Sequence, residues 1–191
     1  MSKALTKWRG PRAVRLDRLA AAHDVVRRAS TGVHSEYLNW SLLLTLASEF
    51  QAFARELHDL GVNAFVASTA PGNERLARVV RARLAGDRAL ARGNPTPEAL
   101  AQDFGRLGLS LWVTLGPAAK PWRASLTTMF EARNAVAHGD DARLAAVRAK
   151  GVGLSVKTIA AWRADLDALA GAMDACVAKH HATLFGTPSP W

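Results

Sequence analysis

Residues 36–60 read EYLNWSLLLTLASEFQAFARELHDL, and this stretch decides the expected fold. It contains neither proline nor glycine, the residues that most often interrupt a helix. It is dense in apolar side chains that suit a protein core: Tyr37, Leu38, Trp40, Leu43, Leu46, Ala47, Phe50, Phe53 and Leu57. We therefore predict a long, largely buried helix that Gly61 would end.

Helical signals also flank this stretch. Residues 12–28 are predicted to form an amphipathic helix, which a turn at the Ser-Thr-Gly sequence of residues 30–32 would follow. Residues 73–92 are predicted to form a basic helix, with Asn73 as its N-cap. The Gly-Asn-Pro sequence at residues 93–95 would end that helix.

The second half of the chain continues in the same way. A short helix is predicted from Thr96 to about residue 107, with Pro97 at its first position. Residues 109–115 are weakly alternating, and because no second strand is evident we interpret them as an irregular apolar connector. A further helix is predicted from about Pro121 to residue 138.

Capping residues mark the remaining elements. Gly139 stands just past the predicted C-terminus of the helix before it, and a short helix is expected over residues 140–150. Ser155 is the expected N-cap of a last long helix, whose apolar residues keep three-and-four spacing as a packing face does. Residues 186–191 contain two prolines and are not expected to be helical.

Together these elements predict an all-α fold, a single-domain, up-and-down helical bundle. A chain of 191 residues is long enough for one domain with a substantial core. We expect residues 1–35 to form a basic N-terminal helical arm packed on the bundle. Residues 36–185 would form the main helical domain, and residues 186–191 an irregular tail.

Composition narrows the location and the chemistry. No apolar run approaches the roughly 20 residues that cross a bilayer, and the basic N-terminus lacks the apolar segment of a secretory signal. We therefore expect a cytoplasmic protein with no membrane partner. Cys176 is the only cysteine, which excludes a disulfide framework and a cysteine-based zinc site. The adjacent pair His180-His181 points in two directions on a helix, so it predicts surface or interface residues and no metal site.

The formal net charge is +9, and part of the excess lies in the predicted basic helix. There Arg78, Arg81, Arg88 and Arg92 would fall on one face. Two interpretations stay open at this point. The face is either an ordinary solvated surface or one that attracts a polyanion such as RNA or DNA.

The most informative polar motif is EARNAVAHGD at residues 131–140. Helical geometry stacks Asn134 and His138 on one face, at the helix end, and turns Arg133 to an adjoining face. Arginine binds phosphate oxygens through its planar fork, and histidine transfers protons near neutral pH, so the combination suits a phosphodiester. The alternative is an exposed arginine beside a histidine that only caps the helix.

An Arg-Asn-x-x-x-His-Gly motif at a helix end of an all-α bundle resembles the HEPN superfamily (higher eukaryotes and prokaryotes nucleotide-binding). Its signature is an arginine, usually followed by Asn, Asp or His, with four to six residues before a histidine; Arg133, Asn134 and His138 fit it. The ASEFQAF sequence at residues 47–53 is similar to a Ser/Ala-x-Phe-Glu segment of bacterial members, with Glu49 one place early. The resemblance covers residues 36–185.

The resemblance implies a metal-independent endoribonuclease of a toxin–antitoxin or antiphage system, acting on RNA without a cofactor. Arg133 would stabilise the phosphorane-like transition state, and His138 would be the general acid or base. Asn134 would orient the imidazole or bind the phosphate. Attack by the 2′-OH would leave a 2′,3′-cyclic phosphate and a 5′-OH. The resemblance also implies a homodimer with a composite site and an antitoxin or defence-system partner. The alternative is a non-catalytic HEPN-like module that dimerises or binds nucleic acid.

Three carboxylates have open roles. Glu49 either lies at the site near Arg133 or is a surface carboxylate paired with Arg55 or another neighbour. Glu131 is expected to be a solvated partner of Arg123 or Arg133. Asp140 stands where one subset of the superfamily has a tyrosine, and it would either orient His138 or weaken RNA binding.

Overall fold

Helices make up almost all of the described chain. The computed structural model describes residues 1–29 and 33–191, with the backbone alone for Val33 and His34. Within these residues there is no β-strand, which confirms the predicted all-α bundle. The turn predicted at residues 30–32 lies outside the described residues.

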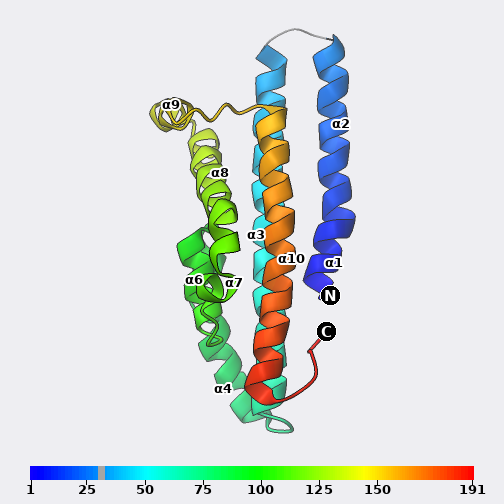
Figure 1. The fold of residues 1–191 in the computed structure, drawn as a ribbon, viewed down its shortest axis with the longest axis vertical. Coiled ribbons are helices and arrows are strands. Elements are labelled where there is room, and N and C mark those ends of the chain that lie inside the picture. The colour runs from blue at the N-terminus through cyan, green and yellow to red at the C-terminus, as the bar shows by residue number, and fades with distance from the viewer. Residues whose placement is uncertain (30–32) are drawn as a thin grey trace.

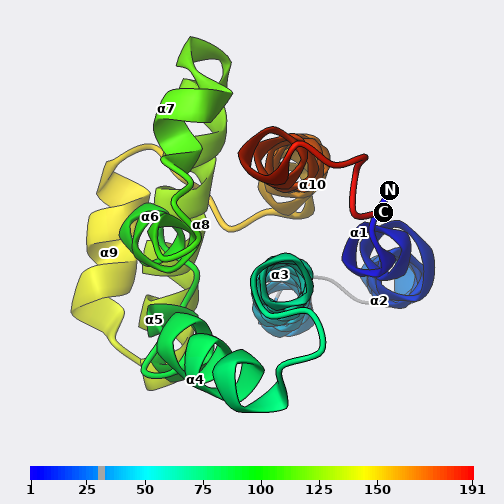
Figure 2. The same ribbon diagram turned by 90° about the horizontal axis from the view of Figure 1, so that it is seen from below.

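The central element is α3 (Val33–Thr69), which runs along the long axis of the molecule (Figure 1). Seen end-on, it is surrounded by α2 (Ala13–Ala29), α10 (Val156–Phe185), α8 (Lys120–His138) and α4 (Glu74–Ala85) (Figure 2). Because neighbours cover it on several sides, α3 supplies much of the core. Its fully buried side chains include Leu43, Leu46, Phe50, Phe53 and Leu57.

The N-terminal arm is longer than the predicted helix of residues 12–28. α1 (Lys3–Lys7) and a kinked segment (Trp8–Arg12), in which Gly10 leaves helical geometry, precede α2. The backbone N–H of Ser2 donates to the carboxylate of Asp174 on α10 at 3.2 Å. The Trp8 indole packs edge-on against Phe50 of α3, with 5.7 Å between ring centroids. These contacts attach the start of the chain to both long helices.

The prediction that Gly61 ends the central helix is wrong, because α3 continues to Thr69. Gly61 is instead a packing residue. A Cβ placed on it would lie 2.8 Å from Leu107 Cδ1 and 3.4 Å from Val177 Cγ1, so the missing side chain lets these neighbours approach the helix. The following turns bury Val62 and Val66, and this burial favours continued helix over a stop.

The predicted basic helix is two helices. Asn73 is the N-cap as predicted, and its Oδ1 accepts from the Leu76 N–H at 3.0 Å. However, α4 ends at Ala85 and the chain resumes as α5 (Ala89–Arg92). The predicted single face of Arg78, Arg81, Arg88 and Arg92 is therefore wrong.

Tertiary contacts stabilise this break. The buried carboxylate of Asp103 accepts from the N–H groups of Ala89 at 2.9 Å and Leu90 at 2.8 Å, and so satisfies the free donors at the start of α5. The Arg106 guanidinium donates to the carbonyl groups of Gly86 and Asp87 in the turn. Asp103 and Arg106 are not close in sequence to the residues that they bind at this break.

The next segment follows its capping signals. Thr96 caps α6 (Pro97–Gly105), and its hydroxyl accepts from the Ala99 N–H at 3.2 Å. The predicted irregular connector contains a short helix, α7 (Leu111–Leu115), followed by a 3-10 turn (Pro117–Ala119). The Trp112 indole N–H donates to the carbonyl of Pro97 at 2.8 Å, which ties α7 to the start of α6.

The three C-terminal helices lie close to their predicted positions. α8 ends at His138, α9 (Asp141–Ala149) lies across its end, and Ser155 caps α10 through the Thr158 N–H at 3.2 Å. Residues 187–191 are not helical, as predicted. Across residues 1–29 and 33–191, no helix combines the length and the apolar character that spanning a membrane requires.

Candidate functional site

The end of α8 is shaped by Gly139. This residue has the left-handed conformation (φ 59°, ψ 34°) that glycine adopts without steric cost. Its N–H donates to the carbonyl of Val136, and the Asp140 N–H donates to that of Ala135. The helix therefore stops one residue after His138, and the imidazole stands at its C-terminus as predicted.

Arg133 and Asn134 share one hydrogen-bonded cluster. The Arg133 guanidinium donates from Nη1 to Asn134 Oδ1 at 3.1 Å, and Asn94 donates from Nδ2 to the same oxygen at 2.7 Å. All three residues are half-buried. Arg133 forms no ion pair with any residue that the structure describes, so its positive charge is not neutralised by a carboxylate.

Asn94 belongs to the site, and the sequence did not indicate it. It lies in the segment after α5, where the Gly-Asn-Pro sequence was interpreted only as a helix stop. Gln51 of α3 holds this segment by donating from Nε2 to the Gly93 carbonyl at 2.7 Å. The cluster is thereby connected to the central helix. The usable signal was Gln51, which lies inside the ASEFQAF segment.

His138 is exposed and makes no hydrogen bond to a described residue. It lies five residues after Arg133 on the same helix, so the two side chains leave the helix axis in directions that differ by about 140°. One copy of the chain therefore does not direct both groups at one point. Asn134 and His138, four residues apart, lie on one face as predicted.

Asp140 serves α9. Its Oδ1 caps that helix by accepting from the Arg143 N–H at 3.0 Å, and its Oδ2 lies 3.1 Å from Arg143 Nε. Both carboxylate oxygens are therefore engaged with Arg143, and no contact between Asp140 and His138 is present among the described residues.

A hollow of about 330 Å³ lies beside Asn134, between α8 and α9. It is lined by Glu131, Asn134, Arg143, Ala146, Val147 and Lys150. Glu131 pairs with Lys150 at 2.7 Å, so the expectation that it pairs with Arg123 or Arg133 is wrong. Arg123 instead lies over the Trp112 ring, 5.1 Å from its centroid.

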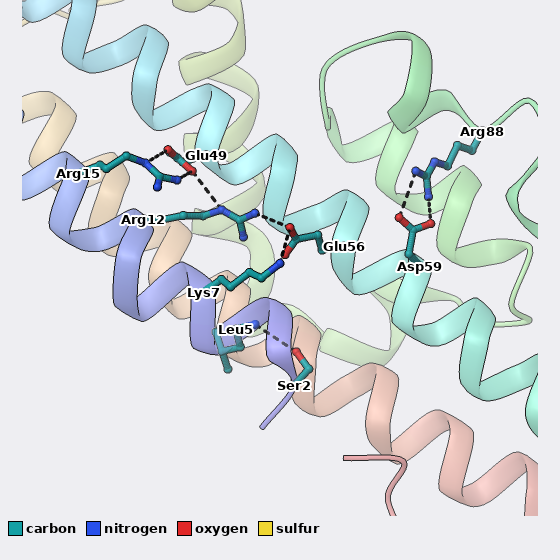
Figure 3. A network of polar contacts seen from close by, with 9 residues as sticks. All are labelled: Ser2, Leu5, Lys7, Arg12, Arg15, Glu49, Glu56, Asp59 and Arg88. Atoms are coloured by element: carbon teal, nitrogen blue, oxygen red, sulfur yellow. Dashed lines mark hydrogen bonds and ion pairs between the residues drawn. The ribbon is translucent and has the colours of Figure 1, made fainter.

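Glu49 lies against the N-terminal arm. Arg12 Nε is 3.1 Å from Glu49 Oε2 and Arg15 Nε is 2.6 Å from Oε1, while a second Arg12 nitrogen reaches Glu56 at 2.9 Å (Figure 3). The hydrogen bond to Glu49 raises the pKa of Arg15. Arg55 binds the carbonyl groups of Leu90 and Ala91, so the expected pairing of Glu49 with Arg55 is wrong. Glu49 attaches α2 to α3.

His180 and His181 have structural partners, whereas neither ring nitrogen of the buried His23 has a hydrogen bond to a described residue. His180 Nε2 bonds the Leu107 carbonyl at 2.9 Å, and His181, which is buried, bonds the Ser68 hydroxyl at 3.1 Å. The surface prediction is therefore wrong for His181. The described residues contain no group of three His, Cys, Asp or Glu side chains arranged to hold a metal ion. Cys176 is buried, and burial raises the pKa of its thiol.

The site is thus an unneutralised arginine, an asparagine anchored by Asn94, and an exposed histidine, all at one end of α8. No protein-family model, curated protein or solved structure matches this chain.

Proposed function

We propose that this protein is a metal-independent endoribonuclease of the HEPN type, in a toxin–antitoxin or antiphage system. The observation that carries the proposal is the state of Arg133. Its guanidinium has no carboxylate partner among the described residues, and Asn134, the residue that it contacts, is anchored from a second segment by Asn94. A cation held in this way suits a phosphodiester oxygen.

The chemistry is a transesterification. The ribose 2′-oxygen forms a bond to phosphorus as the bond from phosphorus to the 5′-oxygen breaks. The His138 imidazole takes the 2′-OH proton, and the imidazolium so formed gives that proton to the leaving 5′-oxygen. Arg133 stabilises the charge on the phosphorane oxygens.

Asn134 has a defined part in this scheme. Its Oδ1 already accepts from Arg133 and Asn94, so its Nδ2 is turned away from both donors. No described residue accepts a hydrogen bond from that nitrogen. It is thus available to donate to a phosphate oxygen on the face that it shares with His138.

A homodimer would direct an Arg133 and a His138 at the same phosphate. Arg133 and His138 diverge by about 140° on one helix, so one chain does not direct both groups at the same phosphate. A two-fold axis beside the end of α8 would bring the arginine of one subunit toward the histidine of the other.

The test is cleavage of end-labelled single-stranded RNA in EDTA by wild type, Arg133→Ala and His138→Ala. We expect fragments ending in a 2′,3′-cyclic phosphate from wild type, with rates lower by about 10²–10⁴-fold in both variants. Arg148→Ala, which removes an exposed arginine paired with Glu36, is the matched control and should cleave normally. Retained cleavage in both site variants, with helical content unchanged, would show the assignment to be wrong.

One observation favours a second function, a non-catalytic module that binds RNA or dimerises. Asp140, the carboxylate nearest to His138 in sequence, is engaged by Arg143. An imidazole without an orienting partner is poorly prepared for catalysis. This alternative predicts RNA binding that weakens steeply with salt and yields no product, in the presence or absence of an antitoxin or other defence-system partner.

A further inference from the structure

The arginines from Arg75 to Arg106 differ from most others in the chain. Among them only Arg88 forms an ion pair, with Asp59 of α3 (Figure 3). Most of the arginines outside this segment do pair with carboxylates: Arg9, Arg12, Arg15, Arg27, Arg143, Arg148 and Arg163. Apart from Arg88, the arginines of α4 and α5 therefore have no carboxylate partner among the described residues.

Most of these arginines lie on α4. Arg75, Arg78 and Arg83 are exposed, and none of them has a hydrogen bond, ion pair or ring contact with a described residue. Arg81 donates only to the neutral amide of Asn63, at 3.2 Å. Like charges three or four residues apart destabilise a helix, and Glu74 is the one acidic residue of α4.

Arg75, Arg78 and Arg83 lie on the outward half of α4, with Arg78 about 60° and Arg83 about 80° to either side of Arg75 around the helix. We call these three residues the α4 arginine face. The opposite side of α4 packs on the core through Val80 and the buried Leu84. Figure 2 shows α4 at the periphery of the molecule, beside α3. The apolar surface on the outward side is small, because it consists of Leu76 and Val79, which are 43% and 67% exposed.

Basic groups continue from this face toward the candidate site. A hollow of about 350 Å³ at the end of α4 is lined by Arg83 and Arg106 together with the turn. Beyond it, the exposed Arg92 ends α5, and its guanidinium contacts only the carbonyl of Asp87. Asn94, which binds Asn134, comes two residues later.

We propose that the α4 arginine face binds the phosphate backbone of a single-stranded RNA whose other end reaches the Arg133 site. The inference rests on the proposed function for the identity of the polyanion and for the Arg133 site that its other end reaches. A series of unpaired guanidinium groups complements successive phosphates, whereas two exposed aliphatic side chains give a membrane little surface to bury. Contact away from the reacting phosphate holds the strand without reading bases.

The experiment measures RNA binding separately from cleavage. Fluorescently labelled single-stranded RNA is titrated with His138→Ala protein at several salt concentrations. The test protein also carries Arg75→Gln, Arg78→Gln and Arg83→Gln. The matched control carries Arg18→Gln, Arg28→Gln and Lys157→Gln, which remove the same charge from α2 and α10 at exposed cations that likewise lack described partners.

We expect the α4 variant to bind at least about 10-fold more weakly at low salt, with a slope of log K against log salt shallower by about 2, since each phosphate contact on a single strand contributes about 0.7. The control should keep the parental slope. An unchanged slope in the α4 variant, or an equal loss in the control, would overturn the inference. So would binding of the parent to anionic lipid vesicles but not to RNA.

The outcomes separate the two proposals. Binding that depends on the α4 arginine face, without cleavage by wild type under any condition, would support this inference and contradict the nuclease. Cleavage that depends on Arg133 and His138, with RNA binding indifferent to the α4 variant, would do the reverse.

Discussion

At the scale of single residues, the side-chain amide of Asn134 determines what the site can bind. Its oxygen accepts two hydrogen bonds, from Arg133 and from Asn94, so rotation that exchanges the oxygen and nitrogen would place donors against donors. The amide nitrogen therefore has one preferred direction. In the proposed nuclease Asn94 would be a positioning residue, because it would act on the RNA only through Asn134.

Replacing Asn94 tests this role. We expect Asn94→Ala to slow RNA cleavage by about 10-fold, because the amide of Asn134 loses the shorter of its two anchoring hydrogen bonds. The control is Asn63→Ala. Asn63 accepts a hydrogen bond from Arg81 of α4, so its replacement also removes an asparagine contact, but it should leave the cleavage rate unchanged. Single-turnover rates and urea unfolding of both variants provide the measurement. Equal rates in the two variants would contradict the positioning role.

The buried His58 has a partner at each of its two ring nitrogens. The Asp103 carbonyl, 3.1 Å from Nε2, can only accept, and the Arg88 guanidinium, 3.4 Å from Nδ1, can only donate. These partners hold His58 neutral, with its proton on Nε2. Burial, with a contribution from Arg88, lowers the pKa of His58 below its ordinary value of 6.5, although Asp103 and Asp59 act in the opposite direction.

The lowered pKa predicts acid sensitivity. Below about pH 6.5 the unfolded chain binds a proton that folded His58 does not. The free energy of unfolding should therefore decrease, as the pH is lowered, by up to about 1.4 kcal/mol per pH unit until the folded pKa is reached. His58→Gln retains a donor for the Asp103 carbonyl and should flatten this part of the curve. His180→Gln, which changes a histidine bound to the Leu107 carbonyl, should keep it. Urea unfolding between pH 7.5 and 5 is the measurement, and parallel curves for wild type and His58→Gln would show the linkage to be wrong.

At the scale of elements, the sequence predicted helix ends where the signal is local. Asn73, Thr96, Ser155 and Gly139 cap their helices through hydrogen bonds to residues three or four positions away. The sequence did not predict helix ends that depend on contacts with residues far away in the chain. Asp103 and Arg106 stabilise the break between α4 and α5, and no pattern within residues 73–92 contains that information.

Gly61 is the clearest failure of this kind, and it gives an element-scale prediction. Gly61→Ala should be less stable than Gly105→Ala by about 1–3 kcal/mol, because its new Cβ would lie 2.8 Å from Cδ1 of the buried Leu107, and displacing that side chain offsets the gain in helix propensity. Gly105→Ala is the matched control, since it also adds a methyl group to a helical glycine but meets nothing within 4 Å. That variant should be neutral or more stable by up to about 1 kcal/mol. Thermal unfolding decides, and equal effects of the two substitutions would contradict the packing role.

At the scale of the whole molecule, the candidate site was predictable in part. Arg133, Asn134 and His138 lie on one helix, so helical periodicity alone places them relative to one another. Glu49 comes from α3, and its partners Arg12 and Arg15 come from the arm. Asn94 reaches the site through a segment held by Gln51. Contacts between elements so far apart in sequence depend on how the helices pack.

The composite site is the property that only the assembled molecule can show. If each site takes Arg133 from one subunit and His138 from the other, a mixed dimer of Arg133→Ala and His138→Ala contains one intact site and one doubly altered site. Mixing the two inactive variants after subunit exchange should then restore about a quarter of the wild-type cleavage rate, since half of the dimers are mixed and each has one working site.

The controls are the Arg133→Ala protein alone and the His138→Ala protein alone, each taken through the same subunit exchange. Both should stay inactive. Sedimentation should show a dimer at the concentrations used. Restoration that follows subunit exchange and disappears on dilution below the dimer dissociation constant would locate the chemistry between two copies of α8. Inactive mixtures of demonstrated heterodimers would instead place Arg133 and His138 in the same subunit's site, against the roughly 140° that separates them on the helix.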